Sequence, residues 1–319
     1  MQRPAALDMT RTSPLRGKVV VVTGAGSGIG RALTLAIARR GGRLSVCDLD
    51  AGGLAETADA ARALGAEVQA STLDVADRPA VREYARTVSA HFGAVHQLYN
   101  NAGIVGGAGL LATEYELLDR VLAVNLGGVI SCAKEFLPHL IRSGDGHLVN
   151  ISSLNGLLAN QHLNAYCTSK FAVRGFTESV RAEMLCLGHP VRVSLVHPGG
   201  VATNIARSAV APASLSAKEL DVYRAGQEFF EKRLLKMPPT QAAEIIIRGV
   251  ERGRPRILVG SDARIADRLT RLFPSACLGL LAGAERFFAS RIAAGPEHRP
   301  DRPRAARAPQ ARAGRRRRS

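Results

Sequence analysis

The sequence lacks several features that mark secreted and membrane-spanning proteins. Its five cysteines show no paired spacing, and residues 1–14 contain no apolar central run of the kind found in a secretory signal. Between residues 265 and 292 the apolar clusters stop short of the roughly 18 to 20 residues that cross a bilayer. We therefore expect a cytoplasmic protein whose thiols are reduced.

Acidic and aromatic residues are also scarce. Asp and Glu number 27 against 43 Lys and Arg, which gives a formal net charge of +16, and tryptophan is absent. Residues 296–319 are rich in arginine and poor in acids, a composition that predicts a disordered tail. No aromatic side chain accompanies these arginines for base stacking, so we expect a solvated tail and no specific nucleic acid partner. Binding of a polyanion through the tail stays open as an alternative.

Alternating strand and helix patterns organise most of the chain. They run from residue 15 to about residue 262 without an obvious linker, which favours one α/β domain over two smaller ones. Residues 1–14 are expected to be a flexible arm, residues 204–237 interrupt the βα rhythm, and residues 263–295 form a helical appendage. Basic residues flank the apolar clusters of that appendage. One interpretation is therefore peripheral membrane contact, and the other is packing on the body or at a subunit contact.

A glycine-rich turn follows the first predicted strand. Residues 19–22 are a β-branched apolar run suited to a buried parallel strand, and they lead into Thr23-Gly24-Ala25-Gly26-Ser27-Gly28-Ile29-Gly30. A helix with one apolar face is predicted over residues 31–40. The N-terminus of such a helix offers free N–H groups and partial positive charge to a pyrophosphate, and glycine lets that group approach the backbone closely. The turn therefore predicts a dinucleotide site.

Two acidic residues follow the next predicted strands. Asp48 ends a strand over residues 44–47, where a carboxylate accepts hydrogen bonds from adenosine ribose hydroxyls. The same carboxylate repels a 2′-phosphate, so NAD is favoured over NADP. Asp74 ends the next strand unit and is expected to face the adenine amino group. NADP stays open because four arginines lie nearby in the sequence, namely Arg31, Arg39, Arg40 and Arg43.

Tyr166 and Lys170 stand at i and i+4 of a helix predicted over residues 164–187, so their side chains share one face. A phenol with a pKa of about 10 is a poor base at neutral pH, and a neighbouring cation lowers this pKa by stabilising the phenolate. Lowering the pKa by roughly 3 needs about 4 kcal/mol, which an ammonium group and a cationic nicotinamide ring can supply. The pair predicts a proton-transfer site.

In these motifs the chain resembles the single-domain branch of the short-chain dehydrogenase/reductase family over residues 15–262. The matching positions are the glycine turn, residues 100–103, Asn125, Ser153, Tyr166 with Lys170, and residues 198–203. The resemblance implies a Rossmann-type, doubly wound parallel sheet of about seven strands with helices on both faces, and hydride transfer at nicotinamide. It also implies that residues 204–237 form a mobile substrate lid.

The resemblance implies a role for each matching side chain. Tyr166 is the general acid/base, Ser153 donates a hydrogen bond to the reacting oxygen, and Lys170 holds the nicotinamide ribose and lowers the Tyr166 pKa. Asn125 fixes a water through its helix backbone and completes a proton path. Ser152 is the rival for Ser153, and the thirteen-residue offset to Tyr166 favours Ser153. The implied cofactor contacts are Thr23, Gly24, Ser27, Gly28, Ile29, Gly30, Asp48, Asp74, Val75, Asn101, Ala102, Gly103, Tyr166, Lys170, Pro198, Gly199, Val201 and Thr203.

The sequence thus predicts an NAD(P)-dependent oxidoreductase that interconverts an alcohol and its carbonyl compound. A secondary, apolar alcohol is favoured, no metal is needed, and a homodimer or homotetramer is expected. An apolar substrate pocket is suggested by Ile104, Val105, Leu154, Leu157 and Leu158, while Cys167, His147 and His197 are interpreted as structural. The alternatives are a catalytically silent dinucleotide-binding sensor or scaffold, and a polyanion binder acting through the basic tail.

Overall fold

The computed structural model describes residues 14–107, 109–203, 205, 209–217, 220–221, 223–224, 235–279 and 282–283. The chain divides into two compact units after Pro274, and the whole sheet belongs to the first. Helix α9, Ser261–Leu272, also lies in the first unit and contacts the last strand. This unit therefore extends past residue 262, where the sequence pattern ends it. The predicted arm, apart from Pro14, and the predicted arginine-rich tail lie outside the described residues.

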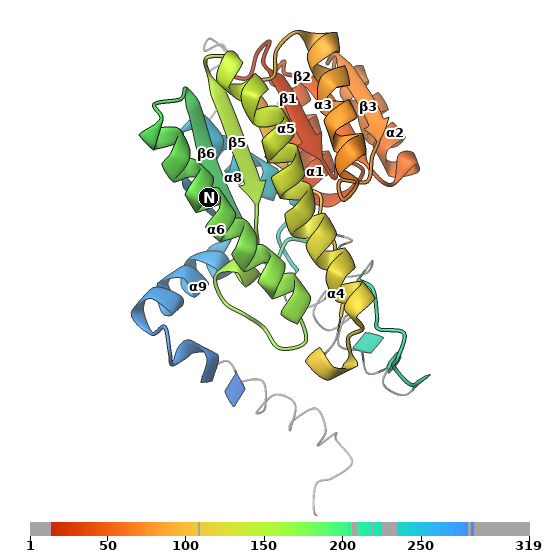
Figure 1. The fold of residues 1–319 in the computed structure, drawn as a ribbon, viewed down its shortest axis with the longest axis vertical. Helices are drawn as coiled ribbons and strands as arrows, with labels where there is room; N and C mark the ends of the chain where they lie inside the picture. Colours follow the sequence, from red (N-terminus) through yellow and green to blue (C-terminus); the bar gives the residue numbers. More distant parts are fainter. Residues whose placement is uncertain are drawn as a thin grey trace, which may run out of the picture. The chain divides into compact units, whose positions relative to one another are not determined.

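Seven parallel strands form one sheet in the order β3-β2-β1-β4-β5-β6-β7, which confirms the predicted Rossmann-type fold (Figure 1). One half of the sheet consists of β1 Val19–Thr23, β2 Arg43–Asp48 and β3 Val68–Thr72. The other half consists of β4 Gln97–Asn100, β5 Gly146–Ile151, β6 Val191–Pro198 and β7 Arg256–Val259. The strand order reverses between β1 and β4, and such a switch point opens a crevice at the carboxyl ends of the strands.

Helices cover both faces of the sheet, and the central strand β1 is buried and apolar on both sides. Val20 and Val22 join the core under α1 Gly28–Ala38, α2 Ala51–Ala63 and α8 Pro239–Glu251. Val19 and Val21 join the opposite core under α3 Arg78–Phe92, α5 Gly128–Arg142 and α6 Asn164–Cys186. In Figure 1, α5 and α6 lie side by side in front of the sheet. The valine run of β1 therefore serves two cores, as a strand buried on both faces must.

The helical stretch from Tyr115 to Arg142 consists of three segments. Helix α4, Tyr115–Leu122, passes into a π-helical turn, Ala123–Gly127, before α5 begins. Asn125 lies in this turn, and π-turns of this kind are frequent at functional sites. The continuous helix is long and apolar enough to cross a bilayer by length and composition, but half of the most apolar stretch is buried in the protein. Because α5 packs on β4, β5 and α3, it is a core helix of this fold.

Candidate active site

The glycine turn is fastened to the neighbouring strand end by side-chain hydrogen bonds. Thr23 Oγ1 accepts from the backbone N–H groups of Asn101 and Ala102, each at 3.0 Å. Asn101 Nδ2 donates to the carbonyl oxygens of Thr23 and Gly24 at 3.0 Å. These bonds join the carboxyl ends of β1 and β4 across the switch point. Thr23 is therefore a brace behind the turn, and its side chain does not line the pocket described below.

Two glycines of the turn have backbone conformations that other residues rarely adopt. Gly24 has φ +66° and Gly28 has φ +52°. A Cβ on Gly24 would lie 2.7 Å from the Ala102 Cα, so the two strand ends approach too closely for a side chain. Gly30 serves a different purpose, since a Cβ there would overlap the Gly24 carbonyl oxygen. Gly30 does not line the pocket, and its missing side chain allows close packing of α1. Its contact with the cofactor stays a prediction.

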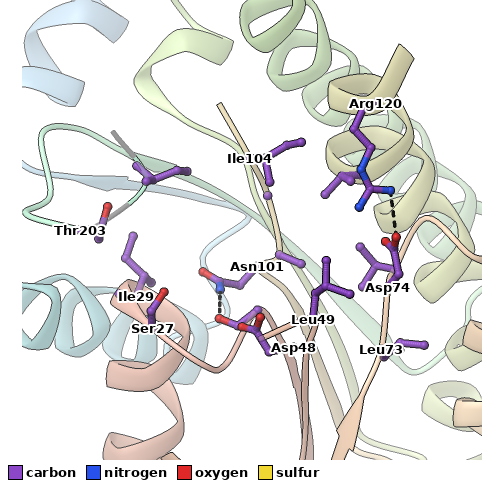
Figure 2. A pocket seen from close by; sticks show the side chains of 17 residues that line it. Ser27, Ile29, Asp48, Leu49, Leu73, Asp74, Asn101, Ile104, Arg120 and Thr203 are labelled. Atoms are coloured by element: carbon purple, nitrogen blue, oxygen red, sulfur yellow. Dashed lines mark hydrogen bonds and ion pairs between the residues drawn. The ribbon is translucent and has the colours of Figure 1, made fainter. Parts of the chain in front are cut away.

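A pocket opens at the switch point, and most of the predicted cofactor contacts line it (Figure 2). Thr203 and Ile29 lie on one side, and Arg120 with Asp74 lies on the other. The predicted residues that line the pocket are Gly24, Ser27, Gly28, Ile29, Asp48, Asp74, Val75, Asn101, Ala102, Gly103 and Thr203. The residues added by the structure as cofactor-pocket lining are Leu49, Leu73, Ile104, Arg120, Val124 and Ile205. Leu49 and Leu73 flank the predicted aspartates, so proximity in sequence could have revealed them.

Both predicted aspartates are held in fixed positions. Asp48 Oδ2 accepts from the Gly26 N–H at 2.7 Å, and its Oδ1 accepts from the Asp50 N–H at 2.9 Å. Asp74 forms an ion pair with Arg120 at 2.9 Å and accepts from the Ala76 N–H at 3.0 Å. Arg120 comes from α4, far away in the sequence, so no local pattern marks it. Both aspartates therefore line the pocket, and Asp74 already has Arg120 as its ion-pair partner. Their contacts with ribose and adenine stay predictions.

The nearby arginines do not supply a free cation for a phosphate. Arg40 pairs with Glu244 at 2.7 Å, and Arg43 pairs with Glu67 at 2.7 Å. Together with Arg39 they lie at the end of α1 and the start of β2, at the sheet edge opposite the pocket. Arg31 is nearer, but its guanidinium donates to the carbonyl oxygens of Gly26 and Gly53 and to Glu56, at 3.0, 3.1 and 2.8 Å.

The predicted reaction groups meet behind Gly103. Tyr166 and Lys170 lie in the first turns of α6, with 8% and 3% of their surface exposed. Lys170 Nζ lies 5.6 Å from the centre of the Tyr166 ring and donates to the Ile151 carbonyl at 3.1 Å. A Cβ on Gly103 would lie 3.2 Å from Asn125 Oδ1 and 3.4 Å from Lys170 Nζ. Gly103 therefore separates the pocket from the lysine by bare backbone alone.

Asn125 braces this corner of the site. Its side chain accepts from the Ile104 N–H at 2.8 Å and donates to the Ile104 carbonyl at 2.9 Å. It also donates to Ser169 Oγ at 3.0 Å. The amide thus links the segment after β4 to α6. The water-holding role of its backbone stays a prediction.

Burial dominates the acid–base behaviour of the pair. It raises the Tyr166 pKa to about 12, against a smaller lowering by the Ser153 hydrogen bond. Burial also lowers the Lys170 pKa to about 8. The sequence predicts a lowered Tyr166 pKa, and the protein groups alone produce the opposite direction. The reason is geometric, since the ammonium faces the tyrosine ring and the Ile151 carbonyl, and the phenol is almost fully enclosed.

The two adjacent serines have different surroundings. Ser152 Oγ donates its hydrogen to the Lys170 carbonyl at 2.8 Å and is buried, so it secures α6 to the end of β5. Ser153 begins the short 3-10 helix η3, Leu154–Gly156, and its Oγ accepts from the Asn155 N–H at 3.1 Å. Its hydrogen bond acts on Tyr166. This arrangement supports Ser153 over Ser152 as the partner of the tyrosine.

The turn after β6 reaches the pocket through one of its four predicted residues. The cofactor contacts of the other three stay predictions. Thr203 alone of its predicted residues lines the pocket, whereas Pro198, Gly199 and Val201 do not. Val201 is buried, and the Gly199 backbone packs against the Asp262 carboxylate. Tyr166 and Lys170 also lie outside the lining of this pocket.

The described parts of the predicted lid are fastened to the body. The Val210 N–H donates to the Val105 carbonyl, and the Val210 carbonyl accepts from the Gly107 N–H, both at 3.0 Å. At the other end the Ala202 N–H donates to the Met237 carbonyl at 2.8 Å. Much of the predicted lid between residues 218 and 236 lies outside the described residues. The role of this segment as a lid stays a prediction.

Three side chains interpreted as structural have hydrogen-bond partners within the protein. Cys167 accepts from the Asn160 N–H at 3.4 Å, and His147 Nε2 lies 2.7 Å from Ser194 Oγ. His197 Nδ1 lies 2.8 Å from the Ser153 carbonyl oxygen. Within the part of the chain that the structure describes, no three His, Cys, Asp or Glu side chains gather as metal ligands.

Known proteins are similar to this chain in sequence and in fold. A model of the short chain dehydrogenase family matches residues 18–213. The chain is 47% identical over 277 residues to SadH of Mycobacterium tuberculosis, named as an oxidoreductase, covering 86% of this chain and 98% of SadH. It is 30% identical over 266 residues to estradiol 17-beta-dehydrogenase 11 of Rattus norvegicus, covering 83% of each.

A solved structure shows the same likeness in three dimensions. The crystal structure of a short chain dehydrogenase/reductase from Burkholderia phymatum in complex with NAD superposes with a TM-score of 0.74 at 32% identity. The match covers 81% of this chain and 94% of that one. Levodione reductase superposes with a TM-score of 0.68 at 26% identity, covering 79% of this chain and 98% of that one. With its glycine turn, seven-stranded parallel sheet and buried Tyr166–Lys170 pair, the chain belongs to the short-chain dehydrogenase/reductase family.

Proposed function

We propose that the protein is an NAD-dependent oxidoreductase that interconverts a secondary, apolar alcohol and its ketone. The observation that carries the proposal is made at Gly103, a glycine of the switch-point pocket, where a Cβ would lie 3.2 Å from Asn125 Oδ1 and 3.4 Å from Lys170 Nζ. Tyr166 lies one helical turn from Lys170, so an acid–base pair adjoins the pocket.

The residues present fit a nicotinamide dinucleotide. Gly24, Gly28 and Gly103 present bare backbone to the pocket, and the N-terminus of α1 starts at Gly28. These groups would hold the pyrophosphate, while Asp48 would accept from the adenosine ribose. When bound, the cofactor supplies the hydride acceptor or donor of the reaction. The relative from Burkholderia phymatum, which contains NAD, supports the choice of cofactor.

The chain's own residues would move the proton and hold the reacting oxygen. In ketone reduction Tyr166 donates its hydroxyl proton to the oxygen, and in alcohol oxidation the phenolate takes it back. Ser153 would donate a hydrogen bond to the same oxygen, which stabilises the charge that develops there. Lys170, whose pKa is about 8, is largely protonated at neutral pH and favours the phenolate electrostatically.

The apolar substrate class is supported by side chains around the predicted lid. Ile104 lines the pocket, whereas Leu157 is buried and Leu154 and Leu158 are half-buried. The segment after β4 carries Leu110 and Leu111 on the 3-10 helix η1, Leu110–Ala112, with 67% and 103% of their surface exposed. Exposed apolar side chains on the segment that follows the pocket residue Ile104 would favour substrates with a large hydrocarbon part. The name of the rat relative, an estradiol dehydrogenase, is consistent with that class.

A substrate panel tests the proposal directly. Secondary alcohols of increasing apolar size, and the matching ketones, would be offered to the full chain while the absorbance of reduced nicotinamide is followed. We expect turnover with NAD that rises with the apolar size of the substrate. Tight NAD binding without turnover of any alcohol or ketone would instead support the silent sensor.

Coenzyme choice gives a second prediction. Wild-type protein should bind NAD more tightly than NADP, because Asp48 repels a 2′-phosphate and Arg31 is already paired with Glu56. Asp48→Ala should raise NADP affinity relative to NAD by about tenfold, or about 1.4 kcal/mol. Adding Glu56→Gln should raise it further, because it removes the negative charge paired with Arg31. Both affinities are measured by titration of the purified protein.

A matched control for this series lies on α2, the helix that carries Glu56. Asp59→Asn removes one negative charge from α2, but its partner Arg62 is not a pocket residue. It should leave the ratio of the two affinities unchanged. Tighter binding of NADP than NAD by the wild type would reverse the proposed coenzyme choice.

Self-association is a further proposal. We propose a homodimer or homotetramer, supported by apolar side chains exposed on neighbouring helices, Ile130 on α5 and Phe171 on α6. Light scattering of the full chain measures the state. The cytoplasmic location stays a prediction.

A further inference from the structure

His197 lies where the hydrogen-bond ladder between β5 and β6 ends. The last paired residues are Ile151 and Val196, and the last backbone bond runs from the Ser152 N–H to the Val196 carbonyl at 2.8 Å. Beyond it the chain leaves β5 for η3, while β6 continues beside β7. Ser153 is thus the first residue that the strand ladder no longer holds.

The imidazole of His197 replaces the missing backbone link. Its Nδ1 lies 2.8 Å from the Ser153 carbonyl oxygen, and the side chain is completely buried. A carbonyl oxygen only accepts, so Nδ1 carries the hydrogen and donates it. Nε2 then carries a lone pair, and no partner for it occurs among the described residues. The ring therefore makes one hydrogen bond in this part of the structure, and that bond goes to Ser153.

Two hydrogen bonds consequently hold Ser153, one at its backbone carbonyl and one at its side chain. His197 holds its carbonyl, and the Asn155 N–H donates to its Oγ at 3.1 Å. The hydroxyl hydrogen is then available to donate to Tyr166, whose pKa a Ser153 hydrogen bond lowers. Without the His197 bond, the peptide after Ser153 can turn and carry the hydroxyl away from the tyrosine. Misplacement of a reacting group by about 1 Å can cost about 100-fold in rate.

We propose that His197 is a positioning residue, whose Nδ1–H holds the Ser153 carbonyl so that the Ser153 hydroxyl faces the Tyr166 hydroxyl. The proposal rests on the proposed function, because it assigns His197 an effect only through Ser153. The sequence analysis interprets His197 as structural. The proposal adds an effect of this side chain on the reaction rate.

Variants of the full chain separate this role from simple structural support. His197→Leu removes the donor and should lower kcat by about 10- to 100-fold, with the Kd for NAD within about twofold of the wild type. His197→Asn places an amide N–H near the position of Nδ1 and should restore kcat to within about threefold. His197→Gln places its amide near Nε2 instead and should behave like the leucine variant. The Asn and Gln pair decides the question if the leucine variant does not fold.

A double-mutant cycle tests the route through Ser153. Ser153→Ala should lower kcat strongly, and adding His197→Leu to it should change kcat by less than about threefold, because the positioned hydroxyl is already gone. An equal further loss in that background would overturn the proposal.

His147 supplies the matched control. It is also a completely buried histidine with one hydrogen-bond partner, but it bonds Ser194 inside the sheet. His147→Leu should lower the melting temperature and leave kcat of the folded protein within about twofold. An equal drop in kcat for His147→Leu and His197→Leu would show that loss of any buried histidine slows the reaction. That result would overturn the proposal.

Failure of the inference is distinguishable from failure of the proposed function. If Ser153→Ala loses activity and His197→Leu and His197→Gln do not, only the positioning role fails. If Ser153→Ala turns over like the wild type, the assigned role of Ser153 fails and the inference fails with it.

Discussion

Tyr166→Phe should lower kcat by about 1,000-fold while the Kd for NAD stays within a fewfold of the wild type. Removal of a general acid/base usually costs between about 100-fold and 10,000-fold, and the upper part of that range applies because no other phenol adjoins Lys170 among the described residues. A thousandfold loss corresponds to about 4 kcal/mol of transition-state stabilisation. The measurement is the chemical step at saturating NAD with the best substrate of the panel.

A second buried tyrosine controls for the lost hydroxyl. Tyr99 is completely buried, and its hydroxyl donates to Gln97 at 3.0 Å within the sheet. Tyr99→Phe should therefore reduce stability and leave the rate of the folded enzyme close to the wild type. Wild-type turnover by Tyr166→Phe would show that another group transfers the proton.

Acidification from pH 7 to pH 5 should lower the free energy of unfolding by about 4 kcal/mol through two buried histidines. Burial lowers the pKa of His147 to about 3 and that of His197 to about 4. In the unfolded chain a histidine has a pKa of about 6.5, so the unfolded state binds the proton first as the pH falls. The contribution of each histidine to the free energy of unfolding is therefore present above pH 6.5 and falls below that pH. By pH 5 the loss is about 2 kcal/mol per histidine.

Urea unfolding at both pH values measures this loss. His147→Leu should remove about half of it, because one of the two groups no longer titrates. The window lies above the ordinary pKa of most carboxyl groups, so those groups contribute little to the difference. If His147→Leu lost as much free energy of unfolding between pH 7 and pH 5 as the wild type, His147 would not contribute to that loss.

The sequence determined those parts of the fold that obey short-range rules. Residues 19–22 had to be a strand buried on both faces, because an unbroken β-branched run leaves no polar side for water. Gly24 and Gly28 marked the turn, since their positive φ values exclude most other residues. Tyr166 and Lys170 share a helix face because four residues make about one turn.

Only the tertiary structure decided how each of these side chains is used. Arg120 reaches Asp74 from a helix more than 40 positions away, and Gly30 lies too close to the Gly24 carbonyl oxygen to carry a side chain. The direction of the Tyr166 pKa depends on enclosure by groups from several elements, which no spacing between two residues can express. Likewise the bond from His197 to Ser153 joins two strand ends 44 positions apart. Periodicity and glycine chemistry act over a few residues, whereas burial, ion pairing and close approach arise only when distant segments meet.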